Sequence, residues 1–113
     1  MNVVTLGIAT IDDQKARLAA AFHGEQQGQR IAFASIDLLW KILSPKRLDI
    51  LRAMAGQGAL SIREIARRVG RDVKAVHGDI HALIDAGVVD HNAKGVSFPY
   101  DAVHIDFILA KAA

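Results

Sequence analysis

Two histidines in one predicted helix, His77 and His81, come closest to the spacing of a metal site. Four residues apart on a helix they share one face, and imidazole nitrogens are common zinc ligands. The glutamate that zinc hydrolases carry directly after the first histidine is absent, because Gly78 stands there. Only Asp85 offers itself as a further ligand. We therefore predict no metal and interpret both histidines as facing solvent or DNA.

The charge around Gly78 indicates a second chemistry, the binding of a polyanion. From Lys41 to Gly78 the chain has nine Lys and Arg residues and three Asp and Glu residues, a local charge of +6, whereas the whole chain carries only +2. Such a basic segment between acidic flanks is typical of nucleic-acid-binding proteins. A glycine inside a helix costs roughly 1 kcal/mol relative to alanine. Its place on a polar face predicts close approach of a DNA backbone or base edge.

Several classes of protein are excluded by what the sequence lacks. It contains no cysteine, which rules out disulfides and thiolate chemistry and suits the cytoplasm. No apolar run approaches the roughly 18 residues of a membrane span, and the N-terminus has no basic, apolar signal pattern. No catalytic triad order, nucleophile elbow or phosphate-binding glycine loop is present. We therefore expect a cytoplasmic protein that is not an enzyme and needs no cofactor or membrane.

The elements that would position these residues form a winged helix-turn-helix, predicted at 44–99. A first helix begins after Ser44 and Pro45, a second spans 61–69, and a Gly70-Arg71-Asp72 turn leads to a recognition helix at 72–86. The segment 88–98 predicts a hairpin, the wing, with Lys94 at its tip. Three helices followed by a hairpin are the order of this fold, so the predicted class is α+β.

Within the recognition helix the apolar and polar positions separate onto two faces. Val73, Val76, Ile80 and Leu83 repeat at spacings of three and four and predict the core stripe. Helix-turn-helix proteins place the N-terminal end of this helix in the major groove, and flanking arginines contact phosphates. The predicted DNA contacts are therefore Arg63, Arg67, Arg68, Arg71, Lys74, Ala75, His77, Gly78, His81 and Lys94.

The segment 1–43 is predicted to form an arm of strand, helix and strand, followed by a linking helix. Alternation predicts strands within 2–9 and 30–34, and the helix between them, 11–22, has an apolar stripe expected to be buried: Leu18, Ala19 and Phe22. The linking helix at 36–43 is apolar on most of its surface. We expect it to be buried between the two parts or in a homodimer contact made by Leu39, Trp40 and Leu43.

The last segment, 100–113, alternates apolar and polar residues and predicts a strand. Val103, Ile105, Phe107 and Leu109 share one face, with Ala102, His104 and Asp106 on the other. This strand can join the N-terminal strands in one sheet.

The run IREIARRVGRDVKAVHGD, residues 62–79, resembles a group of small prokaryotic winged-helix proteins grouped with MarR-type regulators. Members are often encoded beside a TumE-type toxin and act as its antitoxin. The resemblance implies DNA contacts from Arg71, Lys74, His77 and Gly78. Compared with MarR-like helices, Ala75 and Gly78 replace the usual base-reading side chains, which favours readout of DNA shape.

The function expected from this resemblance is that of an antitoxin that binds its toxin and represses its own operon, with segment 1–43 serving for dimerisation or for contact with the toxin. A homodimer would cover two operator half-sites about one helical turn apart on double-stranded DNA. Two alternatives stay open: a free-standing transcriptional regulator, and a protein–protein adaptor that uses the winged-helix shape.

Overall fold

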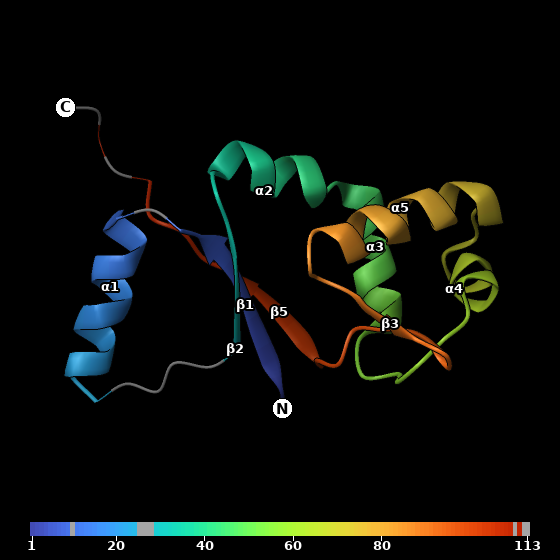
Figure 1. Ribbon diagram of the computed structural model, residues 1–113, viewed down its shortest axis with the longest axis horizontal. Coiled ribbons are helices and arrows are strands. Elements are labelled where there is room, and N and C mark those ends of the chain that lie inside the picture. The colour runs from blue at the N-terminus through green and yellow to red at the C-terminus, as the bar shows by residue number, and fades with distance from the viewer. Residues whose placement is uncertain (10, 25–28, 110, 112–113) are drawn as a thin grey trace.

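The computed structural model describes residues 1–9, 11–24, 29–109 and 111, and within them the chain has an α+β fold (Figure 1). The elements in chain order are β1 (Val3–Ile8), α1 (Ile11–Phe22), β2 (Gln29–Phe33), α2 (Ile36–Ile42), α3 (Pro45–Met54), α4 (Ile62–Val69), α5 (Val73–Asp85), β3 (Asp90–Asn92), β4 (Gly95–Ser97) and β5 (Ala102–Ile105). None of the described helices combines the length and the apolar character that crossing a bilayer requires.

A parallel three-stranded sheet, in the order β2-β1-β5, brings the two ends of the chain together. The predicted joining of the C-terminal strand to the N-terminal strands is thus confirmed, with Leu6 opposite both Ile31 and Ile105. The strand is shorter than predicted, because it ends at Ile105. Beyond it, the N–H of Asp106 donates to the carbonyl of Leu6, and Phe107 packs edge to face on the Trp40 ring at 6.3 Å.

One apolar core joins the sheet to the helices. The predicted inner face of β1 is confirmed, since Val4, Leu6 and Ile8 are all buried. They belong to the same cluster as Leu51 of α3 and Ile80 of α5. In Figure 1 the sheet lies between these helices and α1. The helical half and the sheet therefore stabilise each other through shared burial.

Helix α1 forms as predicted, but its apolar stripe is not buried. Leu18 is 69% exposed and Phe22 is 87% exposed. The prediction for this stripe is therefore wrong for the single chain, since Leu18, Ala19 and Phe22 are all exposed and α1 stands apart from α2–α5 (Figure 1). Parallel sheets are usually covered on both faces, so this arrangement leaves apolar surface open on the sheet side of the molecule.

Helix α2 is only half buried, although its sequence is apolar on most sides. Leu39 is buried in α2, and Leu43, its C-cap, is buried as well. Leu38 and Trp40 remain exposed, Trp40 by 47%. Of the three residues predicted at a dimer contact, Leu39 and Leu43 therefore lie in the core of the chain and cannot reach a partner, which corrects that prediction for them. Trp40 alone offers a surface.

The starts of α3, α4 and α5 are fixed by side-chain caps, as the sequence predicts. Ser44 accepts a hydrogen bond from the N–H of Arg47, and Ser61 accepts one from Glu64. Asp72 accepts from the N–H groups of Lys74 and Ala75, so its carboxylate covers the first turn of α5. These caps satisfy N–H groups that have no partner within the helix.

The short β3–β4 hairpin is tied to the loop that precedes α4. Leu60 and Val96 exchange two backbone hydrogen bonds, of 2.8 and 2.9 Å. Gly95, with φ at 133°, lies so close to this contact that a Cβ would be 2.5 Å from the Leu60 carbonyl oxygen. A larger residue at 95 would push the hairpin away, so glycine is needed there.

The carboxylate of Asp79 joins the helices of the C-terminal half. The Arg47 Nε donates to one oxygen at 3.0 Å and Arg71 Nη1 donates to the other at 2.9 Å. Arg47 also donates to the carbonyl of Ile42 at the end of α2. All three ionic side chains are mostly covered, with 18% of Asp79 exposed. One carboxylate therefore connects α2, α3, the turn before α5, and α5 itself.

The ionisation of Asp79 reflects two opposing effects. Burial alone would raise the pKa of this carboxyl, but hydrogen bonds from Arg71 and Arg47, together with their charges, outweigh burial and hold the pKa below its ordinary value. A carboxyl whose pKa is depressed on folding contributes stability above its unfolded-state pKa, about 4. That contribution is lost as the pH falls through the lower folded-state value.

We predict that Asp79→Asn lowers the free energy of unfolding by about 1–3 kcal/mol at pH 7, because it leaves two covered guanidinium groups without an anion. The deficit should begin to shrink below about pH 4, where the carboxyl of the unfolded wild-type chain becomes protonated, and should disappear only as the pH falls through the lower folded-state pKa. Urea denaturation across this pH range measures both effects. Asp49→Asn is the control, since its pair with Arg52 is exposed and 3.6 Å long. Equal midpoints for Asp79→Asn and wild type would contradict the role given to this carboxylate.

Candidate nucleic-acid interface

A tight turn between α4 and α5 sets the position of the candidate interface. Helix α4 ends at Gly70, which adopts the left-handed conformation with φ at 67°. The N–H of Arg71 then donates to the carbonyl of Ala66, and Asp72 begins α5. A glycine in this conformation lets the chain reverse within three residues. The start of α5 is thereby held close to the end of α4.

Helix α5 has the two faces that the sequence predicts. Val76, Ile80 and Leu83 are fully buried. Val73 is 40% exposed, so the predicted core stripe is wrong at its first position, where the helix is only beginning. The outer face carries the exposed residues Lys74, Ala75, His77, Gly78 and His81. The polar stripe is thus presented to solvent along the first two turns of the helix.

Gly78 interrupts this outer face with a gap in the side chains. A Cβ built at this position has no heavy atom within 4 Å apart from its own helix and neighbours. Its φ is not in the left-handed region, so no backbone requirement selects glycine here. No packing contact within the described residues therefore accounts for this glycine, in contrast to Gly95.

The two histidines next to Gly78 lie against each other. The rings of His77 and His81 have centroids 4.2 Å apart and are tilted by 39°. Among the described residues no group of three His, Asp, Glu or Cys side chains is placed to hold a metal ion. The pair therefore presents hydrogen-bonding nitrogens on the outer face of α5, beside the gap at Gly78.

Two of the predicted phosphate ligands, Arg67 and Arg68, are paired with an acid of their own helix. Arg67 Nε donates to Glu64 at 2.9 Å and Arg68 Nε donates to it at 3.1 Å. Arg68 also donates to the side-chain oxygen of Gln57. The hydrogen bonds from Arg67 and Arg68 lower the pKa of Glu64 to about 2. The acid stays ionised at any physiological pH, so the three side chains together carry a charge of only +1.

Arg71 is not placed as the sequence predicts. Its guanidinium donates to Asp79 and is mostly covered by the protein. A DNA phosphate would have to displace a carboxylate that also holds Arg47. In the structure Arg71 forms part of the internal link between the turn and α5, and its contact with DNA stays a prediction.

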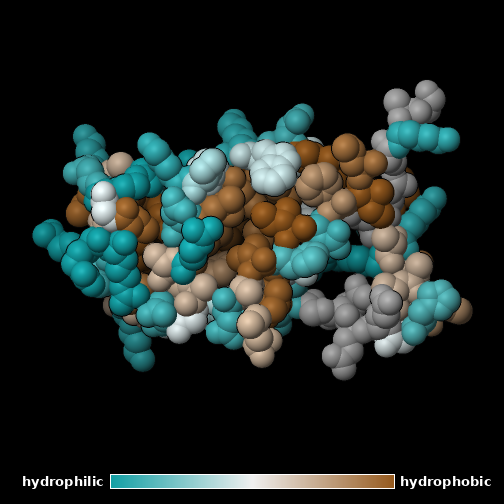
Figure 2. Space-filling model, turned by 180° about the vertical axis from the view of Figure 1, so that it is seen from behind, coloured by the Kyte–Doolittle hydropathy of each residue, from teal (hydrophilic) through white to brown (hydrophobic). Residues whose placement is uncertain are grey.

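Three other cations are placed without a partner. The side chains of Arg63, Lys74 and Lys94 are exposed and form no hydrogen bond or ion pair with any other described residue. They come from α4, the first turn of α5 and the turn of the β3–β4 hairpin, which gather at one end of the molecule (Figure 1). Figure 2 shows this end, at the left of that view, covered by hydrophilic side chains.

Of the two acids that form ion pairs with arginines in this region, Glu64 and Asp79, only Glu64 can be recognised from the sequence alone. Glu64 lies three and four residues before Arg67 and Arg68, a spacing at which helical side chains pair. The Arg47–Asp79 pair spans 32 residues and has no such local signal.

The part of the chain that matches a known family is its helical half together with β5, and not the N-terminal arm. No curated protein matches the sequence. The matched region of the family begins at the end of α2, covers α3, α4, α5 and the hairpin, and ends with β5. Since residues 42–105 match the HVO_A0114 family and make up more than half of the chain, the protein belongs to this family.

Proposed function

We propose that the chain binds double-stranded DNA through a winged helix-turn-helix formed by α3, α4, α5 and the β3–β4 hairpin. In this proposal α5 is the recognition helix and the hairpin is the wing. The observation that carries it is that three exposed cations without partners among the described residues come from elements that lie at one end of the molecule (Figure 1): Arg63 from α4, Lys74 from the first turn of α5 and Lys94 from the hairpin turn. Cations without internal partners can neutralise phosphates without breaking contacts within the protein.

The side chains of α5 favour recognition of DNA shape. Ala75 and Gly78 have no group that can hydrogen-bond to a base edge, and they lie near the start of the helix. A neutral imidazole, as in His77 or His81, can donate one hydrogen bond and accept another. Most of the affinity would then come from phosphates, and sequence preference from groove width and deformability.

The role that we propose for this DNA binding is autorepression by an antitoxin. It rests on the resemblance of residues 62–79 to winged-helix antitoxins encoded beside TumE-type toxins. This proposed role would place the chain in the cytoplasm, together with its operator and its toxin. Co-purification with the product of a neighbouring open reading frame separates this role from that of a free-standing regulator. Salt-dependent binding to duplex DNA separates both from a protein–protein adaptor.

We further propose that the chain acts as a homodimer through the exposed apolar side chains of its N-terminal half. An isolated helix of 12 residues is only marginally stable in water. Helix α1 has this length, and Leu18 and Phe22 are exposed on it. A second copy that covers α1 and Trp40 would bury this surface and present two recognition helices to the operator.

We predict that Lys74→Gln reduces the slope of log affinity against log salt by about one, because one phosphate contact is lost. Glu64→Gln should act in the opposite direction, with tighter binding and a steeper slope, since it releases Arg67 and Arg68. Fluorescence anisotropy on duplex DNA at several salt concentrations measures both. Asp49→Asn changes the net charge equally but on α3, so it should have a smaller effect. The proposed docking would be contradicted if Glu64→Gln and Asp49→Asn gave the same affinity and salt slope and Lys74→Gln bound like wild type.

Gly78→Ala should stabilise the fold yet weaken DNA binding. The added methyl meets open space in the protein, and Gly→Ala at a compatible helical site stabilises by about 0.4–1 kcal/mol. Gly78→Leu should abolish binding while the fold survives. Thermal melts and DNA titrations test this, with Asp85→Ala at the other end of α5 as the control. If both Gly78 variants bind like wild type, this face of α5 does not meet DNA.

The dimer is tested by the double variant Leu18→Ser, Phe22→Ser. Loss of the apolar surface of α1 should convert a dimer to a monomer in light scattering at micromolar concentration, whereas Arg17→Ser on the same helix should leave it dimeric. A wild-type chain that stays monomeric, both alone and on DNA, would rule out the proposed assembly.

A further inference from the structure

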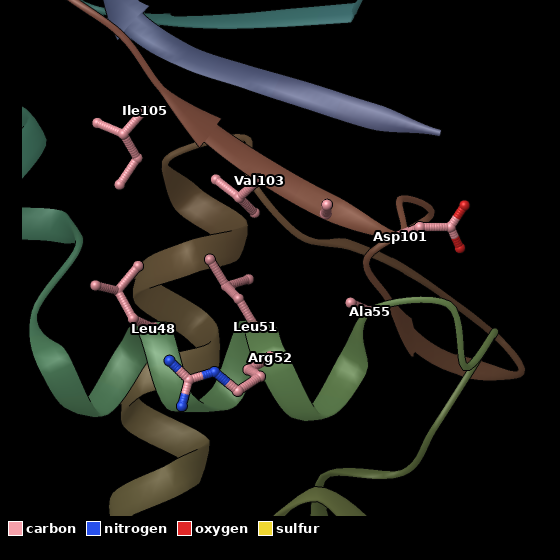
Figure 3. A pocket seen from close by; sticks show the side chains of 8 residues that line it. Leu48, Leu51, Arg52, Ala55, Asp101, Val103 and Ile105 are labelled. Carbon is pink, nitrogen blue, oxygen red and sulfur yellow. The ribbon is translucent and has the colours of Figure 1, made fainter. Parts of the chain in front are cut away.

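A cavity of about 420 Å³ lies between α3 and β5, away from the proposed DNA-binding end. Figure 3 shows its apolar walls: Leu51 points from α3 toward Val103 on β5, Leu48 lies opposite Ile105 at one end, and Ala55 lies at the other end. A volume of this size is within the range of small-molecule sites in proteins.

The cavity remains between α3 and β5 because some of the facing side chains are short and others do not fill the space between the two elements. Among the described strands β5 is an edge strand that pairs with β1, and none of them covers its outer side. Ala55 and Ala102 contribute little bulk to the walls. Val103 and Ile105, which the alternating pattern of β5 directs toward the helices, are only partly buried. The apolar walls of the cavity therefore remain accessible to a ligand.

The charged groups at the cavity favour an anion. The Arg52 side chain is 83% exposed, and its only ion pair among the described residues is the 3.6 Å contact with Asp49. Arg52 lines the cavity on its α3 side, and its guanidinium lies along α3 below Leu48 (Figure 3). The other charged lining residue, Asp101, points away from Val103 and accepts a hydrogen bond from the N–H of Asn2 at 2.8 Å. The available polar group is thus a guanidinium.

We propose that this cavity binds a small amphipathic carboxylate, with its apolar body between α3 and β5 and its carboxylate on Arg52. A guanidinium presents parallel N–H donors that match the two oxygens of a carboxylate. The apolar walls accept an alkyl chain and give no partner to a second polar group within it. The site is separate from the proposed DNA contacts, so it stands or falls independently of DNA binding.

The test is calorimetric titration of the full chain with octanoate, hexanoate and octylammonium. Octanoate should bind saturably, on the order of 1 mM or tighter. Hexanoate, which is two methylenes shorter, should bind about fifteenfold more weakly, because each buried methylene contributes about fourfold. Octylammonium, with the same apolar body and the opposite charge, should not bind measurably. Absence of saturable octanoate binding, or equal binding of the two eight-carbon ions, would overturn the proposal.

Three variants locate the site. Arg52→Gln should weaken octanoate about tenfold. Ala55→Leu, which fills the cavity, should abolish binding, and Val103→Phe provides a second filler should the first fail to fold in thermal melts. Lys46→Gln removes a cation from α3 that does not line the cavity and should have no effect. Unchanged binding to Arg52→Gln or to a folded filler variant would overturn the site. If the only effect of octanoate is to dissociate a dimer, the cavity is instead covered by a second copy of the chain. That result would also overturn the proposal.

Discussion

The carboxylate of Asp79 is the interaction on which the geometry of the helical half depends. It receives one guanidinium from α3 and one from the turn before α5, and Arg47 reaches onward to the end of α2. A mostly covered acid between two arginines is favourable only while all three remain together, because removal of any one leaves an unpaired charge. The direction in which α5 presents its outer face is therefore fixed by an ionic contact beneath it, in addition to the packing of Val76, Ile80 and Leu83.

This arrangement divides the basic residues into two groups. Arg47 and Arg71 are held internally by Asp79, and Arg67 and Arg68 share Glu64. What remains at the end formed by α4, α5 and the hairpin is a small set of exposed cations without partners among the described residues: Arg63, Lys74 and Lys94. The local charge of the sequence therefore overstates the charge available to DNA. A modest salt dependence is expected for each chain, and pairing of two chains would double it.

The sequence predicts those features of the fold that depend on neighbours along the chain. Serine and aspartate caps, the glycine that ends α4, and the alternation in β1 are local signals with local causes, and all were confirmed. The features it misses depend on how distant elements meet. The exposed stripe of α1, the burial of Leu39 and Leu43, the Arg47–Asp79 pair and the cavity beside β5 belong to this class. Periodicity identifies an apolar face, but it does not identify what covers that face.

The central claim, that the outer face of α5 and the hairpin tip meet DNA, is tested most directly by amide chemical-shift mapping of the whole chain during titration with a short duplex. The account predicts that the largest changes fall on Lys74, Ala75, His77 and Gly78, with a second group at Lys94, and that they diminish as salt is raised. Changes confined to α3 and β5, or no changes at low salt, would contradict it.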